Sequence, residues 1–468
     1  MPEPHIVILG GGPAGCGAAF ELQRRRRAKV TLIEQQETVG GNAGSFVVNG
    51  IHLDYGSHRL HAASDPAILA DIKAMLGPDL ADRERHGRIL IRGKYVHFPL
   101  SAPDLLLRLD RPFALGAARD MAVRTLFGKA DPGETFASVL MANLGKTICE
   151  HFYFPYARKI WGRPPQELSG IQARKRVTAG SFPKLLKRLV RPPGKGRFYY
   201  PRRGYGQISE AFAEAGRKLG AELMLGWKVT RLDIPTDSER GWSVEVTRLG
   251  ESRVVHADHV WSTLPASLLT RIVVPAPPPE VIAAAGEIEF RAMLLVYLEL
   301  DCSQFTTTDA HYFPEEHIRM TRLSEPKNYF GHRTPEGRTI LCAEIPCSRD
   351  EALWSMTDAE LGKVVVNDIR SAGLPLMRPP VNIFTKRLPQ AYPIYALGYE
   401  KPFDRLESWV ESLPNFLSYG RQGLFTHDNA HHALYMAYAA AACFEEGTFD
   451  WARWAEFRDV FATHVVED

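Results

Sequence analysis

The chain has 468 residues, 45% of them hydrophobic and 24% charged, which is typical of a soluble globular protein with two or three domains. Its net charge of +3 gives no overall reason to expect a nucleic-acid partner. Six scattered cysteines without a C-x-x-C pair predict a reduced, cytoplasmic protein with no zinc site. The longest apolar run, residues 433–444, is shorter than the roughly 20 residues that span a membrane, so it predicts a buried helix.

The first 34 residues carry a dinucleotide-binding pattern. An apolar run at residues 6–9 breaks into Gly10, Gly12 and Gly15, which form G-x-G-x-x-G at the start of a predicted helix. The first glycine suits a tight turn, the second a close approach of pyrophosphate, and the third a helix–strand contact. A second apolar run ends in Glu34, about 20 residues beyond the glycines, where an acid binds a ribose 2′-hydroxyl. Strand, glycines, helix, strand and acid in this register predict dinucleotide binding.

A second glycine turn follows where an NAD-binding domain would normally continue into another βαβ unit. It reads G-G-N at residues 40–42, and residues 56–61 then read G-S-H-R-L-H. In these motifs the chain resembles the FAD-dependent amine oxidase and protoporphyrinogen oxidase superfamily, and within it the UDP-galactopyranose mutase-like flavoenzymes. The resemblance implies FAD as the cofactor, with Gly41 and Asn42 beside it. It also implies that His58 lies at the reacting edge of the flavin, as a cofactor-binding and catalytic residue.

The segment after this box combines helix and hairpin signals. Apolar residues at three- and four-residue spacing predict a helix within residues 64–90. Two short strands at residues 88–91 and 94–97, joined by Arg92-Gly93, predict a β-hairpin. A mostly helical region then extends to about residue 190, with the composition of a domain that covers a substrate.

The resemblance extends over nearly the whole chain and implies an α/β fold with three parts. The first is a Rossmann-like FAD-binding domain of the glutathione-reductase and amine-oxidase type. The second is a helical insertion, and the third is an antiparallel-sheet substrate domain. We assign residues 1–97, 196–275 and 386–468 to the FAD-binding domain, residues 98–195 to the insertion and residues 276–385 to the substrate domain.

Aromatic and basic residues supply candidate substrate contacts. Tyr156 and Trp161 fit the mutase pattern of Tyr, four residues, then Trp-Gly, and in that family the pair holds the uracil of a nucleotide sugar. Stacking on a base is sensible because every base has a π-face. A family arginine that contacts the diphosphate falls within residues 174–176, in a register that leaves the residue open, and we take Lys175 as the candidate.

Three further residues complete the predicted substrate site. Arg322 falls on a family arginine that binds substrate phosphate, and its guanidinium suits two phosphate oxygens. A surface ion pair between Arg322 and Glu325 is an equally good explanation of the same spacing. Tyr392, in a Tyr-Pro pair, and His61 are the other candidates. The acid that mutases carry shortly after Tyr-Pro is absent, since Ala396 stands there with Leu397.

The remaining predicted FAD contacts come from the second half of the chain. Val229 follows a strand at the position that contacts adenine in this superfamily, and Arg421 lies in a Gly-Arg pair at a strand end. Asn429 precedes the alanine-rich helix, whose N-terminus would face the pyrophosphate. Histidines 427, 431 and 432 lack further convergent cysteine or carboxylate spacing, so no metal site is predicted.

Two functions follow from the resemblance. The first is a mutase-like isomerase that acts on a nucleotide-diphosphate sugar through flavin N5 chemistry, with His58 and Arg322 as catalytic residues. The alternative is a FAD-dependent oxidoreductase, similar to amine oxidases or protoporphyrinogen oxidase, that dehydrogenates a small molecule; the absent acid favours it. NAD(P)H or another reductant is a candidate partner of either.

Overall fold

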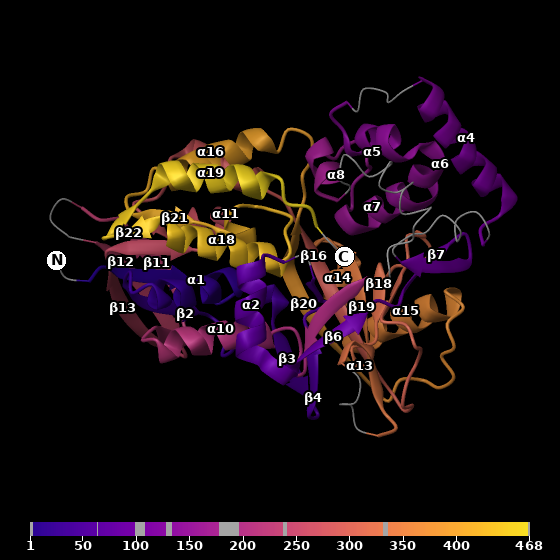
Figure 1. Ribbon diagram of the computed structural model, residues 1–468, viewed down its shortest axis with the longest axis horizontal. Coiled ribbons are helices and arrows are strands. Elements are labelled where there is room, and N and C mark those ends of the chain that lie inside the picture. The colour runs from indigo at the N-terminus through magenta and orange to yellow at the C-terminus, as the bar shows by residue number, and fades with distance from the viewer. Residues whose placement is uncertain are drawn as a thin grey trace.

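The structure of the protein, a computed structural model, describes residues 3–62, 64–98, 108–127, 133–176, 196–236, 241–330 and 336–466. Parts of the predicted helical insertion (99–107, 128–132 and 177–195) lie outside the described residues. Figure 1 shows two lobes side by side, a larger one on the side of the N-terminus and a smaller one beneath a cap of helices.

The larger lobe is built on a five-stranded parallel sheet. Its order is β10 (Glu222–Leu225), β2 (Lys29–Glu34), β1 (His5–Leu9), β14 (His259–Ser262) and β21 (Phe416–Ser418). The strands pair in parallel register, and β1 and β2 are almost wholly buried, as the two apolar runs predict. The segments assigned to the FAD-binding domain therefore meet in one sheet although they are more than 150 residues apart in the chain.

Helices cover one face of this sheet and a smaller sheet covers the other. The helices are α1 (Pro13–Arg24), α10 (Gln207–Lys218) and α18 (Ala430–Ala442), which share one core with β1 and β2. The predicted buried helix is α18; its small side chains let it pack closely on α1, where Leu434 and Ala437 lie against Gly17. The other face packs on β11 (Lys228–Asp233), β12 (Trp242–Arg248), β13 (Glu251–Ala257) and β15 (Val273–Val274), with α11 (Ala266–Leu269), α12 (Pro279–Glu287) and α16 (Glu400–Glu411).

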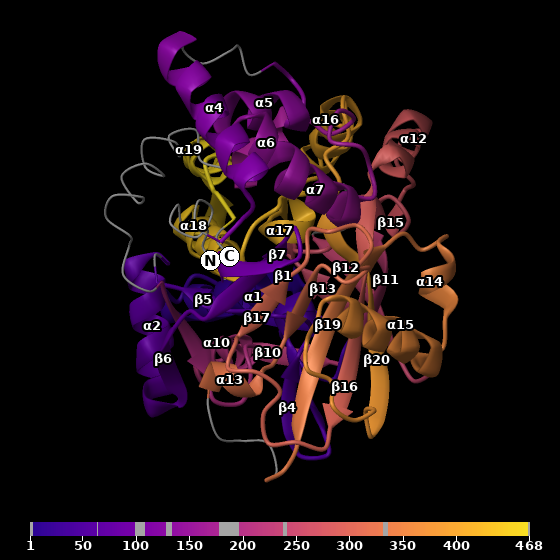
Figure 2. The ribbon, with the colours of Figure 1, turned by 90° about the vertical axis from the view of Figure 1, so that its right-hand side faces the viewer.

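The smaller lobe is a seven-stranded sheet, whose long strands stand side by side in the lower part of Figure 2. Its order is β20 (Asn382–Pro393), β16 (Phe290–Leu300), β19 (Thr339–Cys347), β18 (Arg322–Ser324), β17 (Ala310–Tyr312), β7 (Gly87–Ile91) and β8 (Lys94–Phe98). The helix α15 (Asp358–Ser371) packs on one face, with α13 (Lys327–Phe330) and α14 (Ala352–Ser355) nearby. The sheet is mixed rather than antiparallel throughout, because β7 runs parallel to β17.

Two strands depart from the predicted domain boundaries. The hairpin of β7 and β8 is confirmed, with Arg92 and Gly93 both at positive φ in its turn. It lies in the segment assigned to the FAD-binding domain, yet it extends the seven-stranded sheet, because β17 offers a free edge beside β7. The strand β20 likewise begins before residue 386.

The helical insertion forms the cap at the upper right of Figure 1. It contains α4 (Arg111–Phe127), α5 (Phe136–Leu144), α6 (Lys146–Ile148), the π-helix η3 (Cys149–Tyr153), α7 (Phe154–Trp161) and α8 (Gly170–Arg176). Its own core gathers Phe136, Leu140, Phe154 and Trp161. A mostly helical insertion is thus confirmed for the described part of residues 98–195.

Short elements connect the lobes. The first group is the turn η1 (Gly41–Ala43), the hairpin β3 (Ser45–Val48) and β4 (Ile51–Asp54), and the sheet of β5 (Leu60–His61), β9 (Arg197–Pro201) and β6 (Leu80–Glu84), with α2 (Pro66–Leu76) and η2 (Gly77–Asp79). The C-terminal group is α17 (Gly420–Gly423), β22 (Phe444–Glu445), β23 (Thr448–Phe449) and α19 (Trp451–Ala462). Among the described helices, none has the length and hydropathy to cross a membrane. The six cysteines are free thiols.

Candidate active site

A cavity of about 640 Å³ begins at the carboxyl ends of β1 and β2 and reaches the seven-stranded sheet. This volume lies within the range of about 300–1,000 Å³ that is usual for ligand pockets. The FAD-binding lobe contributes Gly10, Gly12, Glu34 and the 41–43 turn, and the other lobe contributes residues of β17, β18 and β20. Ligand crevices at the carboxyl ends of parallel strands are the rule in open α/β sheets.

The three glycines of the fingerprint have different surroundings. A Cβ on Gly15 would lie 1.9 Å from the carbonyl oxygen of Gly10, so Gly15 permits the contact of α1 with the turn. Gly10 itself has a φ of +99°, which favours glycine. Around Gly12 no atom lies within 4 Å of an added Cβ, and this glycine caps α1 without any side-chain hydrogen bond. Open space before the N–H groups of a helix N-terminus fits a pyrophosphate.

Glu34 lies at the end of β2, 8% exposed and beside the open space. Its Oε2 accepts a hydrogen bond from Gly11 N at 2.7 Å, and its Oε1 accepts one from Gln36 N at 2.8 Å. Burial raises the pKa of the carboxyl, and the two N–H donors oppose that rise. The second glycine turn closes on the same place, because a Cβ on Gly41 would lie 3.5 Å from the Cα of Gly12. These groups suit the ribose and pyrophosphate of a dinucleotide.

Asn42 and His58 line the middle of the cavity. The Nδ2 of Asn42 donates to the carbonyl oxygen of Gln390 at 3.0 Å, which ties the glycine turn to β20. The Nε2 of His58 lies 2.9 Å from the carbonyl oxygen of Tyr55, so this nitrogen carries the hydrogen and Nδ1 is left as the acceptor. Burial lowers the pKa of His58, which keeps the ring neutral at pH 7. His58 can therefore orient a ligand by hydrogen bonding without adding charge.

Arg322 lines the cavity but is already paired with a carboxylate. Its Nε donates to Glu344 Oε1 at 2.9 Å and its Nη2 donates to Glu344 Oε2 at 2.7 Å. The same Oε1 accepts a hydrogen bond from Ser57 N at 2.7 Å. The alternative pairing with Glu325 is wrong, because Glu325 is 2% exposed and accepts from the backbone of residues 305 and 306 instead.

Tyr392, His427 and Arg421 form a stack along one wall of the cavity. The Tyr392 and His427 rings lie 5.1 Å apart at 8°, and the Arg421 guanidinium lies 5.4 Å from the Tyr392 centroid. Arg421 Nη2 also donates to the carbonyl oxygen of Ala391 at 2.7 Å. Asn429 lines the same wall at the start of α18. The stack brings a predicted substrate residue against a predicted cofactor residue, and His427 is an addition to both predicted sets.

Besides Gly15 and Lys175, four predicted residues lie away from the cavity lining. Trp161 is 3% exposed in the core of the insertion, with its ring 5.2 Å from that of Phe136, and Tyr156 is stacked on Phe152. His61 lies in β5, and Val229 packs into the core between the two sheets of the larger lobe. The Trp161 ring also meets His427 of the cavity wall, with the ring centroids 6.2 Å apart. The proposed base-stacking pair therefore packs in the insertion, with Trp161 behind the cavity wall.

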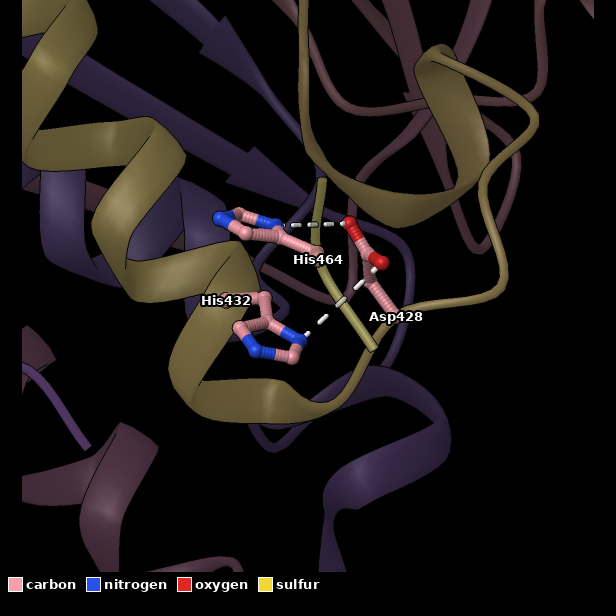
Figure 3. A group of neighbouring side chains, drawn as sticks. All are labelled: Asp428, His432 and His464. Carbon is pink, nitrogen blue, oxygen red and sulfur yellow. Dashed lines mark hydrogen bonds and ion pairs between the residues drawn. The ribbon is translucent and has the colours of Figure 1, made fainter. Parts of the chain in front are cut away.

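Lys175 lies behind the cavity wall rather than in it. Its Nζ donates to the carbonyl oxygen of Phe461 at 2.9 Å and lies 3.7 Å from Asp428 Oδ1. His464 Nδ1 lies at hydrogen-bonding distance from Asp428 Oδ2, 3.2 Å away, and His432 Nδ1 lies 4.0 Å from Oδ1; Figure 3 shows both rings directed at this carboxylate. Burial alone would raise the pKa of Asp428, but the His464 hydrogen bond and the Lys175 charge hold it below the usual value.

This group of Asp428, His432 and His464 has the residue types of a metal site, with its ligand atoms within 4.8 Å of one another. The Lys175 ammonium already supplies a positive charge to the carboxylate, and His432 Nδ1 accepts a hydrogen bond from Asn429 N at 3.2 Å. We therefore interpret the group as an anchor for the segment that follows α19, since this segment contains His464.

The cavity also contains basic residues that the sequence analysis did not single out. They are Arg59, Arg85, Lys386 and Arg387. Arg59 lies inside the G-x-H-x-x-H box, between the two histidines. Its position next to His58 could have identified it as a cavity residue. Lys386 and Arg387 lie on β20, where an alternating strand gives no sign of which face meets a cavity.

Comparison with known proteins gives a consistent picture. The family described as flavin containing amine oxidoreductase matches residues 13–447. Protoporphyrinogen oxidase 1 of Arabidopsis thaliana chloroplasts is 24% identical over 95% of this chain and 87% of its own length. Coproporphyrinogen III oxidase of Bacillus subtilis is 20% identical over 88% of this chain and 91% of its own.

Solved structures share the fold over nearly the whole length. Reduced UDP-galactopyranose mutase superposes with a TM-score of 0.82 at 21% identity, covering 99% of this chain and 100% of the mutase chain. Putrescine oxidase bound to putrescine gives a TM-score of 0.66 at 17% identity, covering 94% and 98% of the two chains. The α/β fold and the FAD-binding architecture expected from the motifs are thereby confirmed.

Proposed function

This chain belongs to the family of flavin-containing amine oxidoreductases and is a FAD-dependent enzyme, and from that premise we propose that it oxidises a small molecule carrying negative charge. The observation that carries the proposal is the charge of the cavity. Six basic side chains line it, namely Arg59, Arg85, Arg322, Lys386, Arg387 and Arg421, against two acidic ones, Glu34 and Asp428.

Both acidic side chains of the lining are engaged. Glu34 accepts two backbone N–H groups at the ribose end, and Asp428 is bound by His464 and Lys175. A protonated amine would need a carboxylate free to receive it, whereas carboxylates and phosphates suit guanidinium groups. The pyrophosphate of FAD offsets part of the positive charge but leaves the acids engaged. An anionic substrate is therefore favoured over an amine.

The residues around the reacting centre would bind and orient rather than exchange protons with solvent. His58, neutral and with Nδ1 as an acceptor, can hold a polar group of the substrate. The Tyr392–His427 stack gives the opposite wall a flat aromatic surface. FAD, when bound, supplies the acceptor for a hydride. The wall that carries His427 and Asp428 is shielded from water, since these side chains are 2% and 4% exposed.

Porphyrinogens are the anionic substrates that the sequence relatives suggest. Two of the relatives that align over most of the chain are named as protoporphyrinogen and coproporphyrinogen oxidases. Both substrates carry carboxylates on a flexible macrocycle that loses hydrogen when it is oxidised. A cavity of about 640 Å³ must hold the flavin as well, so a macrocycle would require the helical insertion to open or part of the ring to stay outside.

A second candidate is a mutase-like reaction on a nucleotide-diphosphate sugar, without net oxidation. It is supported by the near full-length likeness to UDP-galactopyranose mutase and by Arg322 and Tyr392, which line the cavity as that function requires. The burial of Trp161 counts against it, because a base would need to reach that ring, and the half-buried Tyr156 lies outside the cavity lining.

One experiment separates the candidates. The FAD-loaded protein would be mixed without air with coproporphyrinogen III, protoporphyrinogen, putrescine or UDP-galactose, and the flavin absorbance near its visible maximum would be followed. A dithionite-reduced sample would be incubated with UDP-galactose and the sugar isomers separated. We expect loss of flavin colour with an anionic porphyrinogen and none with putrescine.

Two other results of this experiment would contradict the proposed function. Bleaching by putrescine alone would contradict the proposal and show that the cavity charge does not select the substrate. Isomerised sugar in the reduced sample, with no bleaching by any compound, would replace the proposal with the mutase reaction. Oxygen consumption measured in parallel would show whether oxygen is the final acceptor.

A further inference from the structure

Arg59 sits in an aromatic enclosure within the cavity. Its guanidinium lies 5.3 Å from the ring centroid of Tyr329 and 5.6 Å from that of Phe198. Its Nη2 donates to Ser57 Oγ at 3.3 Å and to Tyr312 Oη at 3.4 Å. Rings on its flanks and hydroxyl groups at one edge hold the guanidinium plane in place, because arginine stacks favourably on aromatic faces.

The charge of Arg59 is not matched by an adjacent acid. Within the described residues, no carboxylate lies at ion-pairing distance from Arg59, and its Nη1 is buried without a hydrogen-bond partner. Asp309 acts on Arg59 through space, but its Oδ2 accepts a hydrogen bond from His86 N at 2.7 Å. Arg322, by contrast, is neutralised by both oxygens of Glu344.

We propose that Arg59 is the specificity-determining residue that binds an oxyanion of the substrate, a carboxylate or a phosphate, through its unpaired Nη1 edge. The proposal rests on the proposed function, because it takes the substrate to be anionic, and it names the side chain that receives the charge. Arg322 is the less suitable receptor, since an anion there would have to compete with Glu344.

A binding role explains the burial of Arg59 better than a structural role does. A buried guanidinium without a counter-ion is costly, and proteins retain such groups mainly where a ligand completes them. An arginine kept for structure would instead have its donors satisfied within the fold, as Arg387 has, with the carbonyl oxygens of Trp354 and Met356 and the hydroxyl of Thr385. Arg59 and His58 both line the cavity, so an oxyanion bound by Arg59 would lie in the same cavity as the predicted flavin edge.

The test uses the FAD-loaded protein and two defined probes, pyrophosphate and glutarate. Binding is followed by the flavin difference spectrum and by the rise in Tm with each probe. The variants are Arg59→Met, which keeps the side-chain volume roughly and removes the charge, and Arg59→Lys, which keeps the charge without the fork. Lys386→Met is the matched control, because it removes one positive charge from the same cavity.

We expect Arg59→Met to raise the Kd of at least one probe by about 10-fold or more, Arg59→Lys to have an intermediate effect, and Lys386→Met to change it by about 3-fold or less. The Tm of ligand-free Arg59→Met should equal or exceed that of the wild type. Tighter binding of pyrophosphate than glutarate would identify a phosphate substrate, and the reverse a carboxylate.

If Arg59→Met and Lys386→Met weaken probe binding equally, the proposal is overturned, because the overall positive charge of the cavity would then bind the anion. Unchanged binding by Arg59→Met would also overturn it while leaving an anionic substrate in place. A lower Tm or loss of flavin in Arg59→Met, with Arg59→Lys normal, would assign a structural role and overturn it as well. If wild-type protein binds neither probe, the anionic substrate itself fails, and the proposed function with it.

Discussion

Arg322 and Glu344 stand directly opposite each other on the antiparallel strands β18 and β19, and their side chains form a two-point ion pair at 2.9 and 2.7 Å. The carboxylate also holds Ser57 N, so one acid fixes both the predicted phosphate-binding arginine and the loop that presents His58. The side chains are 14% and 4% exposed, which makes this a largely buried pair. Loss of this ion pair would therefore disturb both Arg322 and the loop that presents His58.

Breaking this pair should destabilise the protein strongly. Glu344→Gln and Arg322→Met each leave a buried partner uncompensated, and each should lower the free energy of unfolding by about 3–5 kcal/mol. The double variant should cost less than the sum, since neither charge is then left alone. Urea unfolding of the four proteins measures the coupling. Strictly additive losses would show that the two side chains act independently.

Gly12 and Gly15 offer a paired test of the cofactor site. Gly12→Ala should leave the flavin-free fold intact, because the new methyl meets open space, and should weaken FAD binding by about 5- to 150-fold through overlap with the pyrophosphate. Gly15→Ala should disrupt the fold itself, since its Cβ would lie 1.9 Å from the carbonyl oxygen of Gly10. Flavin content and circular dichroism separate the two effects. Full flavin content in Gly12→Ala would place the pyrophosphate elsewhere.

Removal of the Glu34 carboxylate should reduce FAD retention. Glu34→Ala frees the N–H groups of Gly11 and Gln36 and removes the expected ribose contact, so we expect the Kd for FAD to rise by about 10- to 100-fold. The ratio of flavin to protein absorbance after gel filtration measures it. Glu37→Ala is the control, because the Glu37 side chain is 69% exposed and pairs with Arg248. Equal retention in both variants would remove the ribose assignment.

His432 should make stability fall in acid. Burial and the neighbouring His431 lower the pKa of His432 to about 3, while the unfolded side chain titrates near 6.5. Because the folded pKa is the lower one, unfolded chains bind a proton that the folded protein does not. Stability is therefore complete above pH 6.5 and is lost as the pH falls toward 3, by at most about 1.4 kcal/mol per pH unit.

The variant His432→Gln should flatten this pH dependence. Glutamine at the third helical position can still accept from Asn429 N but does not titrate. Asp428, Lys175, His431 and His464 face the same place and are present in both proteins, so the difference between the two curves belongs to His432. His52→Gln, at an exposed position, is the control. Urea midpoints between pH 4 and 7 that fall equally in His432→Gln and the wild type would contradict the assignment.

Local patterns in the sequence predicted the elements that local physics decides. The buried strand, the three glycines and Glu34 occupy one βαβ unit, and strand burial, turn conformation and helix start each depend on neighbours within a few residues. The hairpin at Arg92 and Gly93 follows for the same reason, since two consecutive positive φ angles specify its turn. The resemblance to flavoenzymes then supplied the overall architecture.

Contacts between distant segments could not be predicted from the sequence. Whether an aromatic residue lines a cavity or fills a core depends on how whole helices pack, so the Tyr156–Trp161 pattern could not reveal that Trp161 is buried against Phe136. The extension of the smaller sheet by β7 and β8 depends on the free edge of β17, more than 200 residues later. Lys175 likewise contacts Asp428 and Phe461 and does not line the cavity.

The sequence by itself determined a dinucleotide site, because its glycines, helix N-terminus and acid act over short chain distances, and the resemblance to flavoenzymes identified the dinucleotide as FAD. Only the tertiary structure decided which charged side chains line the cavity. Arg59 and Arg322 are the same type of residue, but their neighbours differ. The register of β18 against β19 places a carboxylate beside Arg322, while the fold places aromatic rings and hydroxyl groups around Arg59. The difference arises because an electrostatic interaction depends on separation in space and on burial, and neither is written in the order of the residues.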